Sequence, residues 1–226
     1  MSDQVILAVD VGGSHVKALL STKGSERRRF DSGPHLSAQE MIDGLAEITS
    51  GWSFDVVAIV IPAAVRDGRV TAEPVNLGHG WVGFDFEEAL GKPTKVVNDA
   101  AMQALGSYEG GKMLFLGLGT GLGSALVVDG VVVPMELAHL PFRDSTFEEH
   151  VGSHGRKRLG QRKWEKAVAE TIERLTAALG PDYVVLGGGN AKKLKELPPD
   201  VRLGGNDNAF VGAFRLWDQS FPLTLD

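Results

Sequence analysis

The sequence predicts a mixed α/β protein built from two related domains, and three observations lead to that prediction. Short apolar runs rich in Val, Ile and Leu alternate with amphipathic stretches, as strands alternate with helices. The chain has 29 glycines, and nine of them lie directly after apolar runs, at 12–13, 117–123 and 187–189. Finally, the order of apolar strand, glycine turn and second apolar strand occurs once near the start and again near the middle of the chain.

The two occurrences match at an offset of 107 residues, with 10–23 laid over 117–130. In this alignment Gly12 meets Gly119, and the pair Ala18-Leu19 meets Ala125-Leu126. The match predicts two related domains, each opening with a β-hairpin whose turn faces a shared cleft, where small ligands usually bind.

The elements follow from local pattern. In the first half we expect strands at 5–9, 16–20, 27–31, 55–61 and 95–97, and helices at 37–49, 84–90 and from 100 to at least 105. Ser37 and Glu40 have the spacing of a capping box. In the second half we expect strands at 113–116, 122–128, 131–133 and 183–186, a helix at 164–179 stopped by Gly180-Pro181, and a final helix at 207–217. The expected domains are 1–98 with a C-terminal helix in 207–226, and a larger domain of 99–206.

Composition excludes several classes of function. A formal net charge of −6 argues against nucleic acid as the main partner. The absence of cysteine removes disulfides, thiol catalysis and Cys-ligated zinc, and it fits a reducing compartment. The longest apolar run, 56–65, contains Pro62 and is too short for a membrane span, and residues 1–4 lack the character of a signal peptide. We therefore expect a cytoplasmic protein without a membrane partner.

Three glycine-rich motifs are candidates for binding phosphate, because only glycine lets backbone N–H groups approach a phosphate chain without a Cβ in the way. The first covers 10–17, where Asp10 is placed to hold Mg²⁺ through water and Lys17 lies near the same charge. The second covers 117–123, with the Thr120 hydroxyl at its apex. The third, 187–189, lacks the spacing of a dinucleotide fingerprint. The first and second could instead be turns without a ligand.

Polar side chains outside these turns are candidates for sugar chemistry. Asp99 follows Asn98 at the end of a predicted buried strand, where it could accept a hydroxyl proton or simply cap the next helix. Glu136, His139 and Glu148 could grip sugar hydroxyls, although an isolated loop histidine is often structural and no H-E-x-x-H spacing supports a metal. Five positive charges within 154–163 are either a solvated face or a binding site for a polyanion such as polyphosphate.

The order of these motifs resembles the ROK family of sugar kinases and repressors, particularly its polyphosphate glucokinase branch, over nearly the whole chain. The resemblance implies an actin-like fold of two ribonuclease H-like domains around a cleft, and Mg²⁺-dependent phosphoryl transfer from polyphosphate or ATP to the 6-hydroxyl of a hexose, with glucose favoured. It also implies a homodimer.

The resemblance assigns roles to individual residues. It implies that Asp99 is the catalytic base and that the sugar is held by Asn76, Asn98, Asp99, Glu136, His139 and Glu148. It places phosphate or nucleotide at Asp10, Gly12, Gly13, Ser14, Lys17, Gly119, Thr120, Gly121, Gly187, Gly188 and Gly189.

The sequence departs from the family pattern at three places. The zinc-binding cysteine cluster is absent, so no zinc is expected and His139 is not carried over as a zinc ligand. Ala138 and Ala63 stand where the family usually has glycine. The two alanines keep open a kinase for another hexose. A sugar-binding regulatory protein without turnover is a separate alternative, and the retained Asp99 speaks against it.

Overall fold

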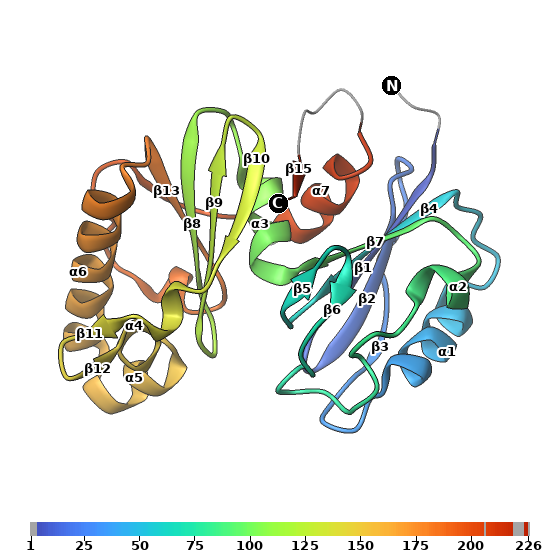
Figure 1. The fold of residues 1–226 in the computed structure, drawn as a ribbon, viewed down its shortest axis with the longest axis horizontal. Helices are drawn as coiled ribbons and strands as arrows, with labels where there is room; N and C mark the ends of the chain where they lie inside the picture. The colour runs from blue at the N-terminus through green and yellow to red at the C-terminus, as the bar shows by residue number, and fades with distance from the viewer. Residues whose placement is uncertain (1–3, 206, 219–223, 226) are drawn as a thin grey trace. The chain divides into compact units, whose positions relative to one another are not determined.

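The computed structural model describes residues 4–205, 207–218 and 224–225, and the chain divides into two compact units (Figure 1). Unit 1 comprises Met1–Met102 and Ala209–Phe221, and unit 2 comprises Gln103–Asn208 and Pro222–Asp226. The chain therefore passes from unit 1 to unit 2 inside a helix, α3 (Asp99–Ser107), and returns at the start of α7 (Asn208–Arg215). Residues 219–223 and 226 of the expected C-terminal segment lie outside the described residues.

Unit 1 is built on a five-stranded sheet in the order β3-β2-β1-β4-β7. The first three strands are antiparallel neighbours, and β4 and β7 run parallel to β1. The bounds are β1 Ile6–Val11, β2 His15–Leu20, β3 Arg28–Asp31, β4 Val56–Ile61 and β7 Thr94–Asn98. A small hairpin of β5 (Val65–Arg66) and β6 (Arg69–Val70) follows β4.

One face of this sheet is covered by α1 (Ala38–Ile48) and α2 (Phe86–Leu90). Alternate residues of β1 and β4 pack with the buried face of α1, as strand geometry requires. The predicted capping box of α1 is confirmed: Ser37 accepts the N–H of Glu40, and Glu40 accepts the N–H of Ser37. After α7, Trp217 Nε1 donates to Val57 O at 3.2 Å, which fastens the returning chain to β4.

Unit 2 repeats the same arrangement with a six-stranded sheet in the order β14-β13-β8-β9-β10-β15. The bounds are β8 Lys112–Leu118, β9 Leu122–Val128, β10 Val131–Met135, β13 Tyr183–Gly187, β14 Val201–Leu203 and β15 Thr224–Leu225. Strands β8, β9 and β10 are antiparallel neighbours, and β13 and β14 run parallel to β8. Without β15, the strand order and directions match those of unit 1, so the expected duplication is confirmed.

Helix α6 (Gln161–Leu179) packs along the unit 2 sheet with α4 (Phe147–Val151), and α5 (Ser153–Leu159) precedes it. Gly180 ends α6 in the left-handed conformation (φ 56°), as its sequence predicts. Two short 3-10 helices, η1 (Leu137–His139) and η2 (Ala191–Lys193), and a hairpin of β11 (Pro141–Phe142) and β12 (Ser145–Thr146) complete the unit.

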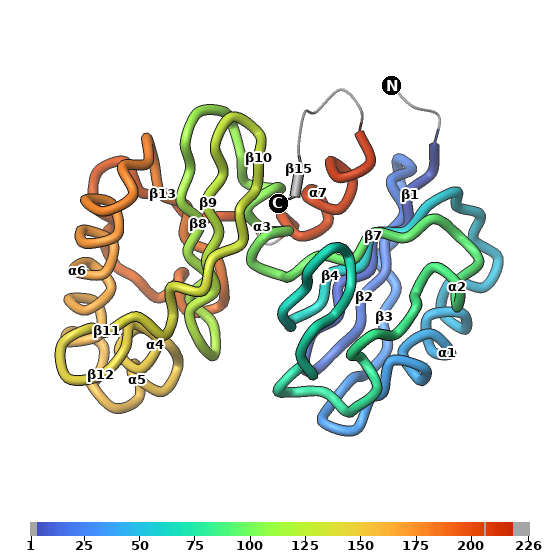
Figure 2. The backbone as a smooth tube through the Cα atoms, in the orientation of Figure 1, coloured from blue at the N-terminus to red at the C-terminus, as the bar shows by residue number. Residues whose placement is uncertain are grey.

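The path of the chain through the two hairpins, β1–β2 and β8–β9, can be followed in Figure 2. The predicted repeat is correct up to the first glycine turn but wrong by one residue after it. In unit 1, Val11 pairs with Val16 across a four-residue turn, whereas in unit 2 Leu118 pairs with Leu122 across three residues. The second hairpin is thus one residue shorter. By strand register Ala18 corresponds to Ser124, and its match to an alanine in the ungapped alignment is a coincidence.

Sequence pattern missed α4, α5, β14 and both small hairpins, because elements of two to seven residues are too short to show a period. Helix α6 begins at Gln161 rather than Trp164, because its first three residues are polar and carry no apolar signal. None of the helices in the described part of the chain combines the length and apolar composition that a membrane span requires.

Candidate functional site

The parallel strands β1, β4 and β7 bring Asp10 and Asn98 to one edge of the unit 1 sheet. Asp10 pairs with Val60 of β4, and Asn98 pairs with Ile61, the next residue. Two strand spacings of about 4.8 Å put the two backbones roughly 10 Å apart. The turn that joins β1 to β2 lies at the same edge, because β1 ends there at Val11.

The β1–β2 turn is held from both sides. The N–H of Gly12 donates to His15 O at 3.0 Å, and the Ser32 hydroxyl donates to Gly12 O at 2.5 Å. Neither Gly12 nor Gly13 has a positive φ, so their lack of a side chain matters for space. A Cβ at Gly13 would lie 3.2 Å from the Cβ of Asn76. The structure therefore brings two predicted site residues, Gly13 and Asn76, into contact.

The loop that carries Asn76 is organised by Glu73. Its carboxylate accepts the N–H groups of Gly80 and Trp81, both at 3.1 Å. Partial desolvation raises the pKa of Glu73, but the backbone N–H groups of Trp81, Gly80 and Val82 outweigh it, and the net pKa is lowered. Glu73 was not predicted from sequence, because its partners lie seven and eight residues away in a segment without regular structure.

Asp10 forms an ion pair with Lys17, its cross-strand neighbour, with Lys17 Nζ 2.9 Å from Asp10 Oδ2. Both side chains are partly buried. Mg²⁺ is commonly held by one or two carboxylates together with water and substrate phosphates, and a half-buried Asp10 fits that donor set. The described residues contain no group of three or more His, Asp or Glu side chains placed to hold a metal by themselves.

Asn98 caps α3, a role that the sequence had left open for Asp99. Asn98 Oδ1 accepts the N–H of Ala100 at 2.9 Å and that of Ala101 at 3.4 Å, and its amide donates to Ala63 O at 3.0 Å. Asp99 is the first residue of the helix, and its Oδ1 accepts the N–H of Ala100 at 2.8 Å. The amide of Asn98 is thus largely engaged by the chain, at the start of the helix on which Asp99 lies.

In unit 2 the turn of 119–121 is clamped by two residues distant in sequence. Gly119 O accepts the N–H of Ser153 at 3.1 Å, the Ser153 hydroxyl at 2.9 Å and Asn190 Nδ2 at 2.9 Å. The two clamping side chains also bond to each other, with Asn190 Nδ2 3.0 Å from Ser153 Oγ. The carbonyl side of the turn is therefore satisfied by protein, while the apical Thr120 is exposed.

Glu148 lies against this same turn. Its Oε2 accepts the N–H of Leu122 at 3.3 Å, and a Cβ at Gly121 would overlap that oxygen. Glu136 and His139 are exposed on and beside η1. No described contact joins either of them to Glu148; the two segments are connected through the backbone, where the first residue of α4 donates to Leu140 O at 3.2 Å.

The three positions at 187–189 differ in why a glycine stands there. A Cβ at Gly187 would overlap the ring of Phe115, and Gly188 combines a φ of 78° with a position where a Cβ would lie 2.5 Å from Leu118 O. Packing accounts for both without a ligand. Gly189 is exposed, with nothing within 4 Å of its would-be Cβ, and it has room for a ligand.

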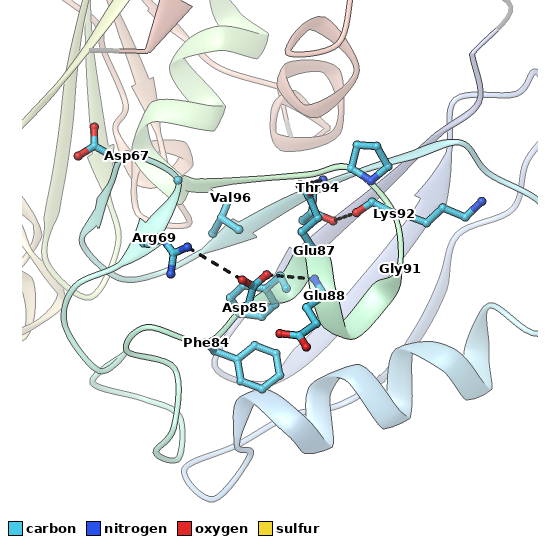
Figure 3. A pocket seen from close by; sticks show the side chains of 13 residues that line it. Asp67, Arg69, Phe84, Asp85, Glu87, Glu88, Gly91, Lys92, Thr94 and Val96 are labelled. Carbon is cyan, nitrogen blue, oxygen red and sulfur yellow. Dashed lines mark hydrogen bonds and ion pairs between the residues drawn. The ribbon is translucent and has the colours of Figure 1, made fainter.

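A cavity of about 670 Å³ lies elsewhere in unit 1, between the β5–β6 hairpin, α2 and the edge strand β7 (Figure 3). Arg69 faces Asp85 across it at 4.0 Å, and Glu87 and Glu88 add further negative charge. None of the predicted site residues lines this cavity. Nothing in the described structure links it to the chemistry above.

Comparison with known proteins shows which proteins the chain resembles. No protein-family model matches the chain. The polyphosphate glucokinase of Mycobacterium tuberculosis H37Rv is 25% identical over 212 residues, which cover 84% of this chain and 80% of that protein. The polyphosphate/ATP-glucomannokinase structure from Arthrobacter sp. strain KM superposes with a TM-score of 0.72 at 23% identity, covering 93% of this chain and 97% of that chain. The chain has the fold of the ROK sugar kinases.

A ROK family glucokinase structure from Streptomyces griseus, in complex with glucose and AMPPNP, gives a TM-score of 0.74 at 16% identity and covers 94% of this chain and 98% of that chain. The resemblance to ROK sugar kinases and the predicted actin-like fold are thus confirmed. Of the three departures from the ROK pattern, two replace a glycine with alanine: Ala138 is buried in the unit 2 core and Ala63 in the unit 1 core. Their methyl groups therefore face protein.

Sequence reasoning did not single out Ser153 or Asn190 as site residues. Each lies beside a glycine motif or a helix start. The hydrogen-bond partner of both side chains, Gly119 O, is 34 and 71 residues away, so local sequence does not indicate the contact. Gly152-Ser153 at the start of a basic segment and Asn190 after three glycines were the available signals.

Proposed function

We propose that this chain is a hexose kinase that transfers a phosphoryl group to the 6-hydroxyl of glucose. One observation carries the proposal: Asp99, the first residue of the helix that Asn98 caps, lies at the same sheet edge as the glycine turn after β1. A carboxylate at this edge can accept a hydroxyl proton while backbone amides nearby face phosphate. The similarity to polyphosphate glucokinases and glucokinases supports the same reaction.

In the proposed reaction, Asp99 accepts the proton of the sugar 6-hydroxyl as that oxygen forms a bond to the terminal phosphorus of the donor. The bond between that phosphorus and its bridging oxygen breaks, and the shortened donor leaves with the electron pair. Asn76, Asn98, Glu136, His139 and Glu148 orient the sugar in this proposal. In phosphoryl transfer the protein mainly positions the reactants and stabilises charge.

The donor is polyphosphate or ATP, held at the turns of 12–14 and 119–121 and at Gly189, whereas packing explains Gly187 and Gly188. Mg²⁺, when bound, would neutralise charge on the donor phosphates, and Asp10 would hold it with Lys17 as the neighbouring cation. A cytoplasmic location and a homodimer remain predictions.

A sugar-by-donor activity matrix on the purified chain tests the proposal. Glucose, mannose, N-acetylmannosamine and an amino sugar are each combined with ATP or with long-chain polyphosphate, with Mg²⁺ present, and sugar phosphate is measured. We expect turnover with glucose and at least one donor. Sugar binding without turnover under every combination would refute the kinase and favour a sugar-binding regulator, whereas turnover confined to another hexose would change only the substrate.

A further inference from the structure

Two basic segments of unit 2, distant in sequence, meet beside the clamped turn of 119–121. The first is 156–163, with Arg156, Lys157, Arg158, Arg162 and Lys163, and the second is 192–195, with Lys192, Lys193 and Lys195. Together they contain eight of the 23 Lys and Arg residues and no Asp or Glu, in a chain with a net charge of −6. These eight residues are called the basic surface below.

The two segments are joined by hydrogen bonds at both ends. Gln161 Nε2 donates to Lys193 O at 2.6 Å, which holds the start of α6 against η2. At the other end, Ser153 and Asn190 bond to each other and to Gly119 O. The basic surface therefore begins at the turn proposed to hold the donor phosphate, and its two strips are fixed with respect to that turn.

Four of these eight cations form no ion pair with an acidic side chain of the described residues. Among the ion pairs of the described residues, none involves Lys157, Arg162, Lys163 or Lys195, and all four side chains are exposed. Natural surfaces usually intersperse the two signs of charge, so an unbroken block of one sign attracts oppositely charged ligands.

Arg156 gives an independent sign that an anion belongs here. Its Nε is buried and has no hydrogen-bond partner within the described residues, and its guanidinium lies 5.8 Å from the ring centre of Trp164. A buried donor without a partner is unfavourable, and the half-buried Arg156 side chain would gain a partner by turning toward a phosphate oxygen at the surface. Arg156 lies three residues after Ser153 on α5, or about 4.5 Å along the helix axis.

We infer that the basic surface binds the distal part of a linear polyphosphate chain whose end is held at the 119–121 turn. This inference rests on the proposed kinase function, since it extends the donor site of that reaction. A polyphosphate carries about one negative charge per phosphate, so a row of cations adds affinity as the chain lengthens, whereas the three phosphates of ATP stay near the turn. The surface thus discriminates donors by chain length.

The test removes four exposed cations that the clamp does not use, in the variant Lys157→Gln/Arg162→Gln/Lys163→Gln/Lys195→Gln. A matched control neutralises four exposed cations of unit 1, in the variant Lys23→Gln/Arg29→Gln/Arg66→Gln/Lys92→Gln. Binding of long-chain polyphosphate, tripolyphosphate and ATP is measured directly by calorimetry without sugar, at two salt concentrations. Thermal unfolding checks that each variant folds.

We expect the first variant to bind long-chain polyphosphate at least about tenfold more weakly, since four modest charge contacts together account for that factor. Its affinity for tripolyphosphate and ATP should change by less than about twofold, its salt dependence for the long chain should fall, and the control should behave as the wild type.

Equal losses for all three ligands, or the same loss in the control, would overturn the inference. So would binding of a single-stranded oligonucleotide of matched charge as tight as that of polyphosphate, which would make this a nucleic-acid surface. Because binding is measured without turnover, an inactive protein that still discriminates by chain length refutes the kinase but supports the surface. An active glucokinase that binds long-chain polyphosphate and tripolyphosphate equally well supports the kinase but refutes the role of the basic surface.

Discussion

Replacing Asp99 with asparagine tests the proposed chemistry with little disturbance of the fold. Asparagine keeps the size of the side chain and can still accept the N–H of Ala100 through its carbonyl oxygen, as Asp99 Oδ1 does at 2.8 Å. The cap of α3 is supplied by Asn98 and stays intact. What is removed is the carboxylate that can accept a proton.

The substitution Asp99→Asn should affect turnover far more than stability. Loss of a general base lowers turnover by about a hundredfold to ten-thousandfold, or about 2.7–5.4 kcal/mol of transition-state stabilisation. Loss of one negative charge in the first turn of α3 lowers stability by only about 0.3–1 kcal/mol. In a chain of this size the melting temperature should fall by no more than about 2–4 °C. Catalysis should therefore collapse in a folded protein.

The assay is a coupled measurement of kcat and KM for glucose, with the better donor and Mg²⁺, beside thermal unfolding. Asp85→Asn is the matched control, because Asp85 caps α2 by accepting the N–H of Glu88 at 3.0 Å and asparagine caps about as well. A turnover number for Asp99→Asn within about threefold of wild type would refute Asp99 as the base. A collapse in the Asp85 control as well would show that the loss is not specific.

Three further results are expected. Asn190→Ala should lower the free energy of unfolding by about 1–3 kcal/mol in a denaturant titration, because Gly119 O loses a buried hydrogen-bond donor. The same variant should raise the KM for the phosphoryl donor more than the KM for glucose. An unchanged free energy of unfolding together with unchanged KM values would contradict the clamp. Gly188→Ala should lower stability by about 1–3 kcal/mol because of its φ of 78° and its close carbonyl contact, while Gly189→Ala, with open space around it, should be nearly neutral; equal effects would contradict this difference. The pKa of Glu73 is lowered in the folded state, so its carboxylate stabilises the fold at pH values above its ordinary pKa of 4.5. This stabilisation is lost as the pH falls through the folded-state pKa. The difference in free energy of unfolding between wild type and Glu73→Gln should therefore shrink on acidification. A gap that is the same at about pH 3 and about pH 7 would rule out this role for Glu73.

Much of the fold could be predicted because its signals are local. The capping box at Ser37, the left-handed stop at Gly180 and the glycine turns between apolar strands each depend on residues within a few positions of one another. The family resemblance then joined these local signals into one order of motifs, and the structural comparison confirmed the fold.

The candidate site was predictable only in its residue types. Sequence pattern weighed Asp99 as a base or as the cap of α3, whereas the cap is Asn98, whose Oδ1 accepts the N–H groups of Ala100 and Ala101. The amide of Asn98 is also held by Ala63 O, 35 residues away, and local pattern does not show such a contact. It treated 187–189 as one phosphate motif, whereas packing against Phe115 and Leu118 explains two of its three glycines.

By itself, the sequence determined where the longer strands, the glycine turns and the ends of helices such as α6 fall, since steric limits on the backbone and side-chain periodicity act between near neighbours. Only the tertiary structure decided the register of the second hairpin and the clamp on Gly119, whose partners are 34 and 71 residues away. The physical reason is that a buried carbonyl must find a donor, and the donor that reaches it is chosen by how the whole sheet and its helices pack.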